Sequence, residues 1–324
     1  MCLRVVHACA WASCVRTYQG MRYLALACDY DGTLAAQGKV IPAALRALER
    51  FRESGRRLIL VTGRQLEDLR AVFPEYELFD RIVTENGAEV FAPDTREQRL
   101  LSDPPPHAFV ERLRTLGVRP LSVGNVIVAT HEPHERTVLE AIREFGLELQ
   151  VIFNKGAVMV LPSGVNKATG LRAALTELRI SVHNTVAIGD AENDHALLSE
   201  VDVAVAVANA LPTLKQHADW VTDGARGSGV IELIDRVLST DLCDLEPSLV
   251  RWQVQLGDRI GEQGTLRVQA RSRRFLLCGA SGSGKSTLAN GWLERMSAKG
   301  YQFCLVDPEG DYDTLTSSIV VGGE

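Results

Sequence analysis

The chain has 324 residues, which is enough for two domains or slightly more at about 150 residues per domain. A hydrophobic content of 46% and a charged content of 23% exclude a chain that is disordered throughout. The formal net charge of −6 argues against nucleic-acid binding based on bulk positive charge, and no apolar run approaches the roughly 18 residues that a membrane span needs.

The first twenty residues differ in character from the rest of the chain. They match a secretory signal peptide only weakly, because His7 interrupts the apolar run and no clear cleavage site follows. We therefore expect residues 1–20 to form an N-terminal extension that is disordered or loosely docked. The seven cysteines include no CxxC pair, so a cytoplasmic location is the simplest expectation.

From residue 23 onward, apolar strands alternate with amphipathic helices. One helix is predicted to begin at Pro42 and to end before Gly55, and another spans residues 168–178 with its leucines on one face. This alternation is typical of a doubly wound α/β fold, in which helices cover both faces of a parallel sheet. The expected strands lie at residues 23–30, 57–64, 81–90, 185–194 and 203–210.

Residues 90–162 interrupt the alternation. They contain three consecutive prolines at 104–106, followed by strand-like stretches at 126–132 and 150–162. A strand-rich insertion in an α/β frame predicts a second, smaller α+β unit. The expected organisation is a core of residues 21–89 and 163–240, an inserted unit at 90–162, a linker or β segment at 241–272, and a C-terminal segment at 273–324.

Two carboxylates follow the first predicted strand. Asp29 and Asp31 lie two residues apart, and Gly32 and Thr33 continue the segment with a turn residue and a hydroxyl. The carboxyl end of a strand is where open α/β sheets place their ligands. A lone pair of acids is more often a solvated turn, so this segment gains meaning only together with others.

Phosphate-binding groups follow at two further points. The second predicted strand ends in Thr62, Gly63 and Arg64, whose hydroxyl and backbone amides are suited to phosphate oxygens. Lys167 precedes an amphipathic helix and could supply a compact positive charge, although an isolated lysine is usually solvated.

A late strand ends in Asp190, with Asn193 and Asp194 close behind it, and these oxygen ligands suit a hard cation. Along the chain the four segments read DYDGT, VTGR, NKATGL and GDAEND, and this ordered set resembles the haloacid dehalogenase (HAD) superfamily of phosphohydrolases. The resemblance covers about residues 22–238. The stretches TENGA, VNKATGL and AVANALPTLKQHADWVT resemble the Cof-type sugar phosphatases, whose α+β cap of type C2 lies between the second and third motifs.

The resemblance implies a role for each motif residue. Asp29 would be the nucleophile that forms an aspartyl-phosphate, and Asp31 would be the general acid and base. Mg²⁺ would be held by Asp29, the backbone carbonyl of Asp31 and Asp190, with Asp194 acting directly or through water. Arg64 would contact the substrate or cap the following helix. The phosphate-binding and supporting residues would be Thr62, Gly63, Lys167 and Asn193.

The function implied is Mg²⁺-dependent hydrolysis of a small phosphorylated metabolite, with a sugar phosphate as the family-level expectation. A phosphomutase on the same scaffold is an alternative, and neither a membrane nor a nucleic acid is expected as a partner. The oligomeric state stays open. Substrate choice would depend on polar side chains of the inserted unit, with candidates at Asn125, His131, His134, Asn154 and Lys155.

The C-terminal segment carries a different motif. Residues 279–286 fit GxxxxGK[ST] between a predicted strand at 274–280 and a predicted helix at 287–296, which is the context of a phosphate-cradling loop. ATP is therefore a possible second ligand there. The residues that would hold it are Gly279, Gly282, Gly284, Lys285, Ser286 and Thr287.

The stretch 303–313 resembles the second strand of HerA/FtsK-like ATPases, which would bring Asp307 and Glu309 near a nucleotide. No later strand supplies a further metal-binding acid, and two strands with one helix are too small for an independent ATPase core. We expect a piece of a longer fusion or a docked stub with weak or no ATP hydrolysis. A nucleotide-binding regulatory module is the second functional alternative, and a P-loop kinase is disfavoured.

Overall fold

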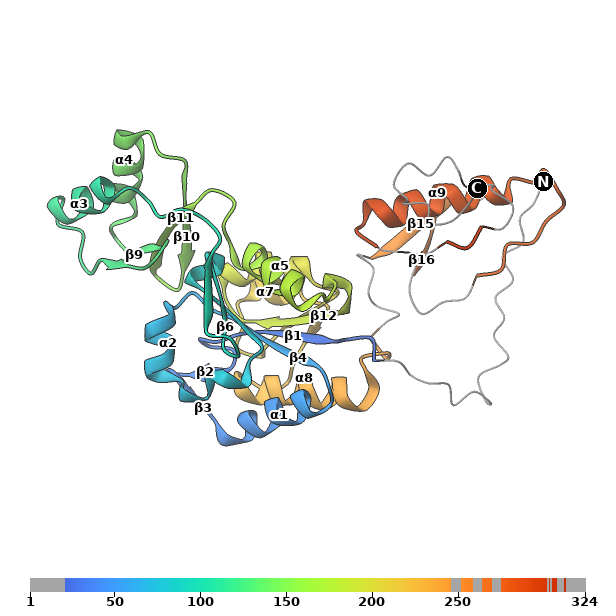
Figure 1. Cartoon of the computed structure of the whole chain (residues 1–324), viewed down its shortest axis with the longest axis horizontal. Helices are drawn as coiled ribbons and strands as arrows, with labels where there is room; N and C mark the ends of the chain where they lie inside the picture. Colours follow the sequence, from blue (N-terminus) through green and yellow to red (C-terminus); the bar gives the residue numbers. More distant parts are fainter. Residues whose placement is uncertain are drawn as a thin grey trace. The chain divides into compact units, whose positions relative to one another are not determined.

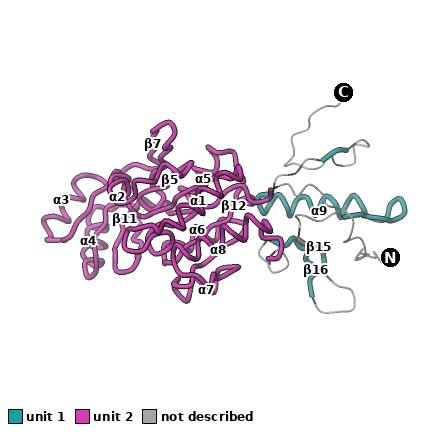
Figure 2. Tube along the Cα trace, turned by 90° about the horizontal axis from the view of Figure 1, so that it is seen from below, with its two compact units in different colours: residues 1–20, 247–324 teal, residues 21–246 magenta. Residues whose placement is uncertain are grey.

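The computed structural model describes residues 21–245, 252–258, 264–269, 275–301, 303, 305–307 and 312. The chain divides into one unit of residues 21–246 and another of residues 1–20 and 247–324 (Figure 2). The expected N-terminal extension lies outside the described residues. Within the described ranges, no helix is both long and apolar enough to cross a bilayer.

The first unit is built on an eight-stranded sheet in the described part of the chain. The first six strands in its spatial order are parallel, and β6 and β7 extend the edge in antiparallel fashion. The strand order is β14 (Trp220–Val221), β13 (Val203–Ala206), β12 (Thr185–Gly189), β1 (Ala25–Asp29), β4 (Arg57–Val61), β5 (Arg81–Thr84), β6 (Glu89–Ala92) and β7 (Glu97–Leu100).

Helices cover both faces of this sheet, which confirms the predicted doubly wound α/β fold. Figure 1 shows α1 (Pro42–Glu53) and α8 (Gly227–Thr240) on one face, with α5 (Lys167–Leu178) and α7 (Pro212–His217) on the other. Every residue of β1 is buried between these layers. Shorter elements complete the unit: a hairpin of β2 (Ala35–Ala36) and β3 (Lys39–Val40), α2 (Leu66–Val72) and α6 (His195–Glu200).

The prediction of a single strand over residues 81–90 was wrong. The chain turns at Glu85 and Asn86, whose φ angles are 50° and 56°, and β5 and β6 pair as a hairpin around them. Because β6 and β7 belong to the large sheet, the inserted unit begins after residue 100 rather than at residue 90. The apolar residues on both sides of the turn explain why the sequence reads as one continuous strand.

The inserted unit, called the cap below, is an α+β layer as predicted. Its antiparallel sheet has the order β10 (Leu149–Asn154), β11 (Ala157–Pro162), β9 (Val128–His131) and β8 (Ser122–Val123). One face packs on α3 (His107–Thr115) and α4 (Glu135–Phe145) through a cluster that includes Phe109 and Val138. Residues of the cap also form a second cluster with Ala88, which anchors it on the core.

In the second unit, β15 (Gln253–Asp258) and β16 (Thr265–Gln269) form a hairpin, and α9 (Lys285–Ala298) confirms the predicted helix. The strands predicted at 274–280 and 303–313 are not formed at their described residues. Leu276 and Val306 are each 86% exposed, and Cys278 is exposed as well. A strand needs a neighbouring strand for its backbone hydrogen bonds. In the described part of this unit β15 and β16 pair with each other, and neither pairs with residues 275–280.

Candidate active site

Three parallel strands deliver acidic and hydroxyl groups to one edge of the sheet. Asp29 is the last residue of β1, Thr62 follows β4, and Asp190 follows β12; the parallel register of the three strands brings their carboxyl ends together. Carboxylate oxygens of Asp29, Asp190 and Asp194 all lie within 4.8 Å of one another. The convergence expected from the motif order is therefore present in the fold.

The turn after β1 closes tightly against Asp190. Gly32 has a φ angle of 95°, and a Cβ atom at this position would lie 2.3 Å from Asp190 Oδ2. The next residue, Thr33, is fully buried and donates its hydroxyl to Asp190 Oδ1 at 3.4 Å. Gly32 is thus required both by the backbone conformation and by the space that Asp190 occupies.

Gly32→Ala is expected to destabilise the protein by about 2–4 kcal/mol, because left-handed strain and a clash with Asp190 add together. Gly38→Ala is the matched control, since its φ angle is 74° but the nearest atom to an added Cβ lies 4.0 Å away. This control should lose only about 1 kcal/mol through backbone strain. Urea unfolding measures both values, and equal losses would contradict the close approach.

Lys167 lies at the start of α5 and reaches into the acidic cluster. Its Nζ donates to Asp29 Oδ1 and to Asp194 Oδ1, both at 2.6 Å, and the side chain is 1% exposed. Asn166 caps the helix by accepting the backbone amides of Ala168 and Thr169. The predicted phosphate-binding lysine is therefore a buried bridge between two carboxylates, and not the solvated side chain that is usual for lysine.

Two glycines allow α5 to approach the turn after β5. A Cβ atom on Gly87 would lie 1.9 Å from the carbonyl oxygen of Asn166, and one on Gly170 would lie 2.3 Å from Val83 Cγ1. Hydrogen bonds hold the Asp194 side chain in place, because its Oδ2 accepts the backbone amides of Asp190 at 2.9 Å and of Ala191 at 3.0 Å. Backbone packing thus holds the lysine and the carboxylates in place.

Burial dominates the electrostatics of this cluster. It raises the pKa of Asp29 to about 7, with the carboxylate of Asp194 adding to the rise and Lys167 opposing it. Burial lowers the pKa of Lys167, but Asp194 and Asp29 outweigh this effect and hold the pKa above its ordinary value. Burial also raises the pKa of Asp190, against the effect of Lys155. The oxygens of these three buried carboxylates lie close enough together to fit a divalent hard cation.

Lys155 reaches the cluster from the cap. It lies in the turn between β10 and β11, and its Nζ donates to Asp190 Oδ2 at 2.8 Å and to the backbone carbonyl of Asp31 at 3.3 Å. Its side chain is 47% exposed. This cap candidate therefore contacts core acids directly.

Arg64 pairs with the second acid of the first motif. Its Nε and Nη2 donate to the two carboxylate oxygens of Asp31 at 2.6 Å and 2.8 Å, and its Nη1 donates to Asp68 at 2.6 Å. The N-cap position of α2 is Gln65, whose side chain makes no capping hydrogen bond. The suggestion that Arg64 caps this helix was therefore wrong, because its guanidinium is engaged by Asp31 and Asp68.

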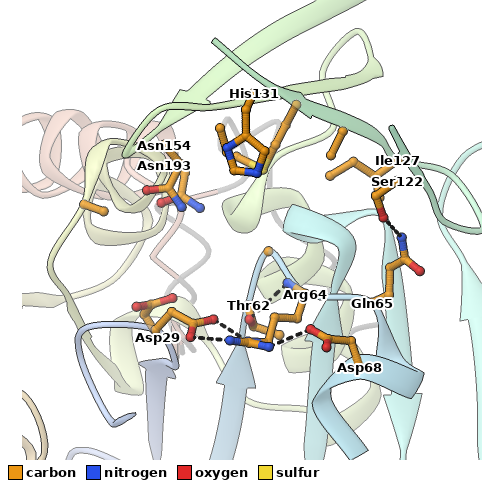
Figure 3. Close-up of a pocket in the computed structure, with 16 residues that line it drawn as sticks. Asp29, Thr62, Arg64, Gln65, Asp68, Ser122, Ile127, His131, Asn154 and Asn193 are labelled. Carbon is orange, nitrogen blue, oxygen red and sulfur yellow. Dashed lines mark hydrogen bonds and ion pairs between the residues drawn. The ribbon is translucent and has the colours of Figure 1, made fainter. Parts of the chain in front are cut away.

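A cavity of about 550 Å³ lies above these residues, between core and cap. Figure 3 shows Thr62, Arg64 and Asp68 on its core side and His131 and Asn154 across from them on the cap side. His134 instead contacts the carbonyl of Arg119, and Asn125 donates to Glu89, so neither lines this cavity. The core side also includes Asp29, Asp31, Gly63 and Asn193.

Sequence reasoning missed the turn residues Glu85 and Asn86. Asn86 is fully buried, and its Oδ1 accepts from Asn193 Nδ2 at 2.9 Å beside the cavity. Glu85 is 1% exposed and binds the cap. The available signal was the Asn-Gly pair at residues 86–87 between two apolar runs, which is typical of a hairpin turn.

The C-terminal motif forms a turn that leads into α9. Gly282 and Gly284 have φ angles of 73° and 86°, and the helix begins at Lys285, whose Nζ donates to the carbonyls of Gly279 at 3.1 Å and Ala280 at 2.9 Å. Ser286 and Thr287 lie in the first turn of α9. Asp307 Oδ2 accepts the backbone amide of Tyr312, whereas Glu309 lies outside the described residues.

Two family models match the chain. A model described as haloacid dehalogenase-like hydrolase matches residues 26–116 and 120–234. A model described as the central domain of helicase HerA matches residues 259–321. The two matches fall on the two motif-bearing parts of the sequence.

Similar curated proteins cover the first unit. The phosphoglycolate phosphatase 2 of Saccharolobus solfataricus is 31% identical over 230 residues, which are 68% of this chain and 94% of that protein. The phosphoglycolate phosphatase of Methanothermobacter thermautotrophicus is 31% identical over 223 residues, which are 66% of this chain and 98% of that protein.

Solved structures share the same fold. A haloacid dehalogenase-like hydrolase from Bacteroides thetaiotaomicron superposes with a TM-score of 0.56 at 20% identity, covering 66% of this chain and 99% of that chain. A HAD/COF-like hydrolase from Plasmodium vivax superposes with a TM-score of 0.59 at 22% identity, covering 69% and 98%.

Proposed function

Because this chain belongs to the haloacid dehalogenase-like hydrolase family, we propose that it is a Mg²⁺-dependent phosphomonoesterase that works through an aspartyl-phosphate on Asp29. The observation that carries the proposal is the cluster of Asp29, Asp190 and Asp194 around the buried Lys167 ammonium. This cluster lies at the carboxyl edge of the sheet, and Asp29 itself lines a cavity large enough for a small metabolite.

Asp29 is the proposed nucleophile because it ends β1 beside the phosphate-binding residues. Its carboxylate oxygen would form a bond to phosphorus while the bond to the leaving oxygen breaks, and Asp31 would give that oxygen a proton. Asp31 would then take a proton from the water that attacks the aspartyl-phosphate, which releases phosphate and regenerates Asp29.

Arg64 would control the orientation of Asp31 in this cycle. Its two hydrogen bonds engage both carboxylate oxygens of Asp31 and fix the plane of the carboxyl group. Thr62, Gly63 and Lys167 would bind the transferring phosphoryl oxygens, supported by Asn193. The protein's part is to orient these groups and to supply positive charge at the oxygens as they react.

The oxygen donors fit Mg²⁺. Asp29, the backbone carbonyl of Asp31 and Asp190 would hold the ion, with Asp194 acting directly or through water. When bound, the ion would reduce the repulsion between these carboxylates and a phosphate dianion.

The proposed substrate is a small phosphorylated metabolite. Phosphoglycolate is the first candidate, because curated relatives that align over nearly their whole length are named for that activity. A sugar phosphate is the second candidate, in line with the resemblance to Cof-type enzymes. A panel of both classes, assayed by phosphate release, tests this choice.

Removal of Mg²⁺ by EDTA is expected to lower phosphate release by about 100-fold or more, and added Mg²⁺ should restore it. Asp190→Asn should raise the Mg²⁺ concentration needed for half-maximal rate by about 10- to 100-fold, because a buried carboxylate ligand becomes neutral. Asp94→Asn, which alters an acid that is 67% exposed outside the cavity, is the control. Phosphate release that continues unchanged in EDTA would contradict the metal requirement.

A further inference from the structure

One core carboxylate, that of Glu85, accepts three backbone amides of the cap loop of residues 124–127, which joins β8 to β9. Glu85 Oε1 accepts the backbone amide of Asn125 at 2.6 Å, and Oε2 accepts those of Val126 at 2.7 Å and Ile127 at 2.9 Å. A Cβ atom on Gly124 would lie 2.3 Å from Glu85 Oε1. The loop can approach this carboxylate only because residue 124 has no side chain.

The backbone of the turn at Glu85 is hydrogen-bonded to the segment after β4 that carries Thr62 and Arg64. The amide of Glu85 donates to the carbonyl of Arg64 at 2.8 Å, and the amide of Asn86 donates to the carbonyl of Thr62 at 3.0 Å. The turn at Glu85 therefore binds the segment that carries Thr62 and Arg64. Glu85 therefore links two segments: its backbone binds the segment with Thr62 and Arg64, and its side chain binds the cap loop.

The two linked segments face the same cavity. Ile127 lines it from the cap, and Thr62 and Arg64 line it from the core. The Glu85 side chain is 1% exposed, so its hydrogen bonds are shielded from water. Charge-assisted bonds of this kind are about twice as strong as neutral ones, and three amides share this carboxylate.

We propose that Glu85 is a positioning residue that fixes the cap's cavity-lining loop relative to the phosphate-binding segment, and so sets which leaving groups the cavity accepts. The proposal deepens the proposed function and rests on it. The hydrogen bonds of Glu85 go to the cap loop and to the carbonyl of Arg64 rather than to the nucleophile, so it acts through the cap loop. Its loss should change recognition of the leaving group more than the chemistry at phosphorus.

Two variants attack this contact from opposite sides. Glu85→Gln removes the charge and gives at least one cap amide a mismatched partner, whereas Gly124→Ala places a methyl carbon 2.3 Å from Glu85 Oε1, too close for both atoms to keep their positions. Both should raise KM for the preferred metabolite by about 10- to 100-fold while kcat changes less than about 3-fold. For acetyl phosphate, whose leaving group is very small, kcat/KM should stay near the wild-type value.

The matched control is Glu89→Gln. Glu89 is also fully buried beside the cap, but among the described residues it accepts the side-chain amide of Asn125 at 2.9 Å and no backbone amide of the cap loop. This variant should keep the wild-type KM for both substrates. A common loss of activity on both substrates in Glu85→Gln and Gly124→Ala would mean a general structural defect and would overturn the positioning role.

Hydrogen exchange gives a readout that does not depend on activity. Amides of residues 125–127 should be protected in the wild type and should exchange at least about 10-fold faster in Glu85→Gln and Gly124→Ala, with peptides of β1 and β4 unchanged. Wild-type exchange rates and wild-type KM values in both variants would overturn the proposal. A wild-type protein that hydrolyses no phosphomonoester would instead count against the proposed function, and faster exchange would not rescue it.

Discussion

Asp29→Asn is expected to lower phosphate release by about ten-thousandfold or more, because an amide oxygen does not form the covalent phosphoryl bond. Asp29 is 4% exposed and ends a fully buried strand. Asparagine has nearly the same size and shape as aspartate, so the fold should stay intact. The rate should be measured at saturating Mg²⁺ and saturating substrate. Acid quenching during turnover should trap a phosphorylated protein with the wild type and not with this variant.

The control for this substitution is Asp235→Asn on α8. Asp235 is 52% exposed and pairs with Arg50 away from the cavity, so this variant should retain the wild-type rate. If Asp29→Asn kept more than about a tenth of the wild-type rate, a covalent role for Asp29 would be ruled out, and the cluster would need another nucleophile.

Lys167→Met should have the largest effect on stability. Removing the ammonium leaves the carboxylates of Asp29 and Asp194 facing each other without their shared donor in a buried site. Breaking a buried ion pair by deleting one partner typically costs about 3–5 kcal/mol, and methionine keeps most of the apolar stem in place. We expect a loss of that size in urea unfolding without Mg²⁺, together with at least about a 100-fold loss of activity.

Lys155→Met is the same substitution at a half-exposed lysine of the cap. Its ion pair with Asp190 reaches solvent, so the expected loss of stability is below about 1 kcal/mol. Equal losses for the two variants would show that burial does not set the importance of Lys167. A recovery of Lys167→Met stability on adding Mg²⁺ would support a cation site among the remaining carboxylates, since a ligand that binds only the folded state stabilises it.

The convergence of the acids could be predicted because it depends on a general property of parallel sheets. Asp29, Thr62 and Asp190 each end or follow a strand, and such ends share one edge whatever the loops between them do. The burial of Lys167 could not be predicted in this way. It depends on the close approach of α5 to the turn at Gly87, which is a property of tertiary packing.

The other differences between prediction and structure each have an identifiable cause. The hairpin at Glu85 reads as one strand because apolar residues flank the turn on both sides, and only the Asn-Gly pair marks it. The run at residues 275–278 has a strand composition, but composition does not supply a neighbouring strand to pair with. The Arg64 pairing with Asp31 joins residues 33 positions apart, and no local pattern encodes it.

The contact between Glu85 and the loop after β8 has a practical meaning for protein engineering. A cap grafted from another hydrolase would have to match more than the points where the chain enters and leaves the cap. The cap of this protein also binds Glu85 of the core. A grafted cap therefore needs a residue without a side chain at the position of Gly124, followed by three backbone amides that can donate to Glu85. Without these groups the buried Glu85 carboxylate would lose its hydrogen-bond donors from the cap, and the contact between cap and core would be lost at that point.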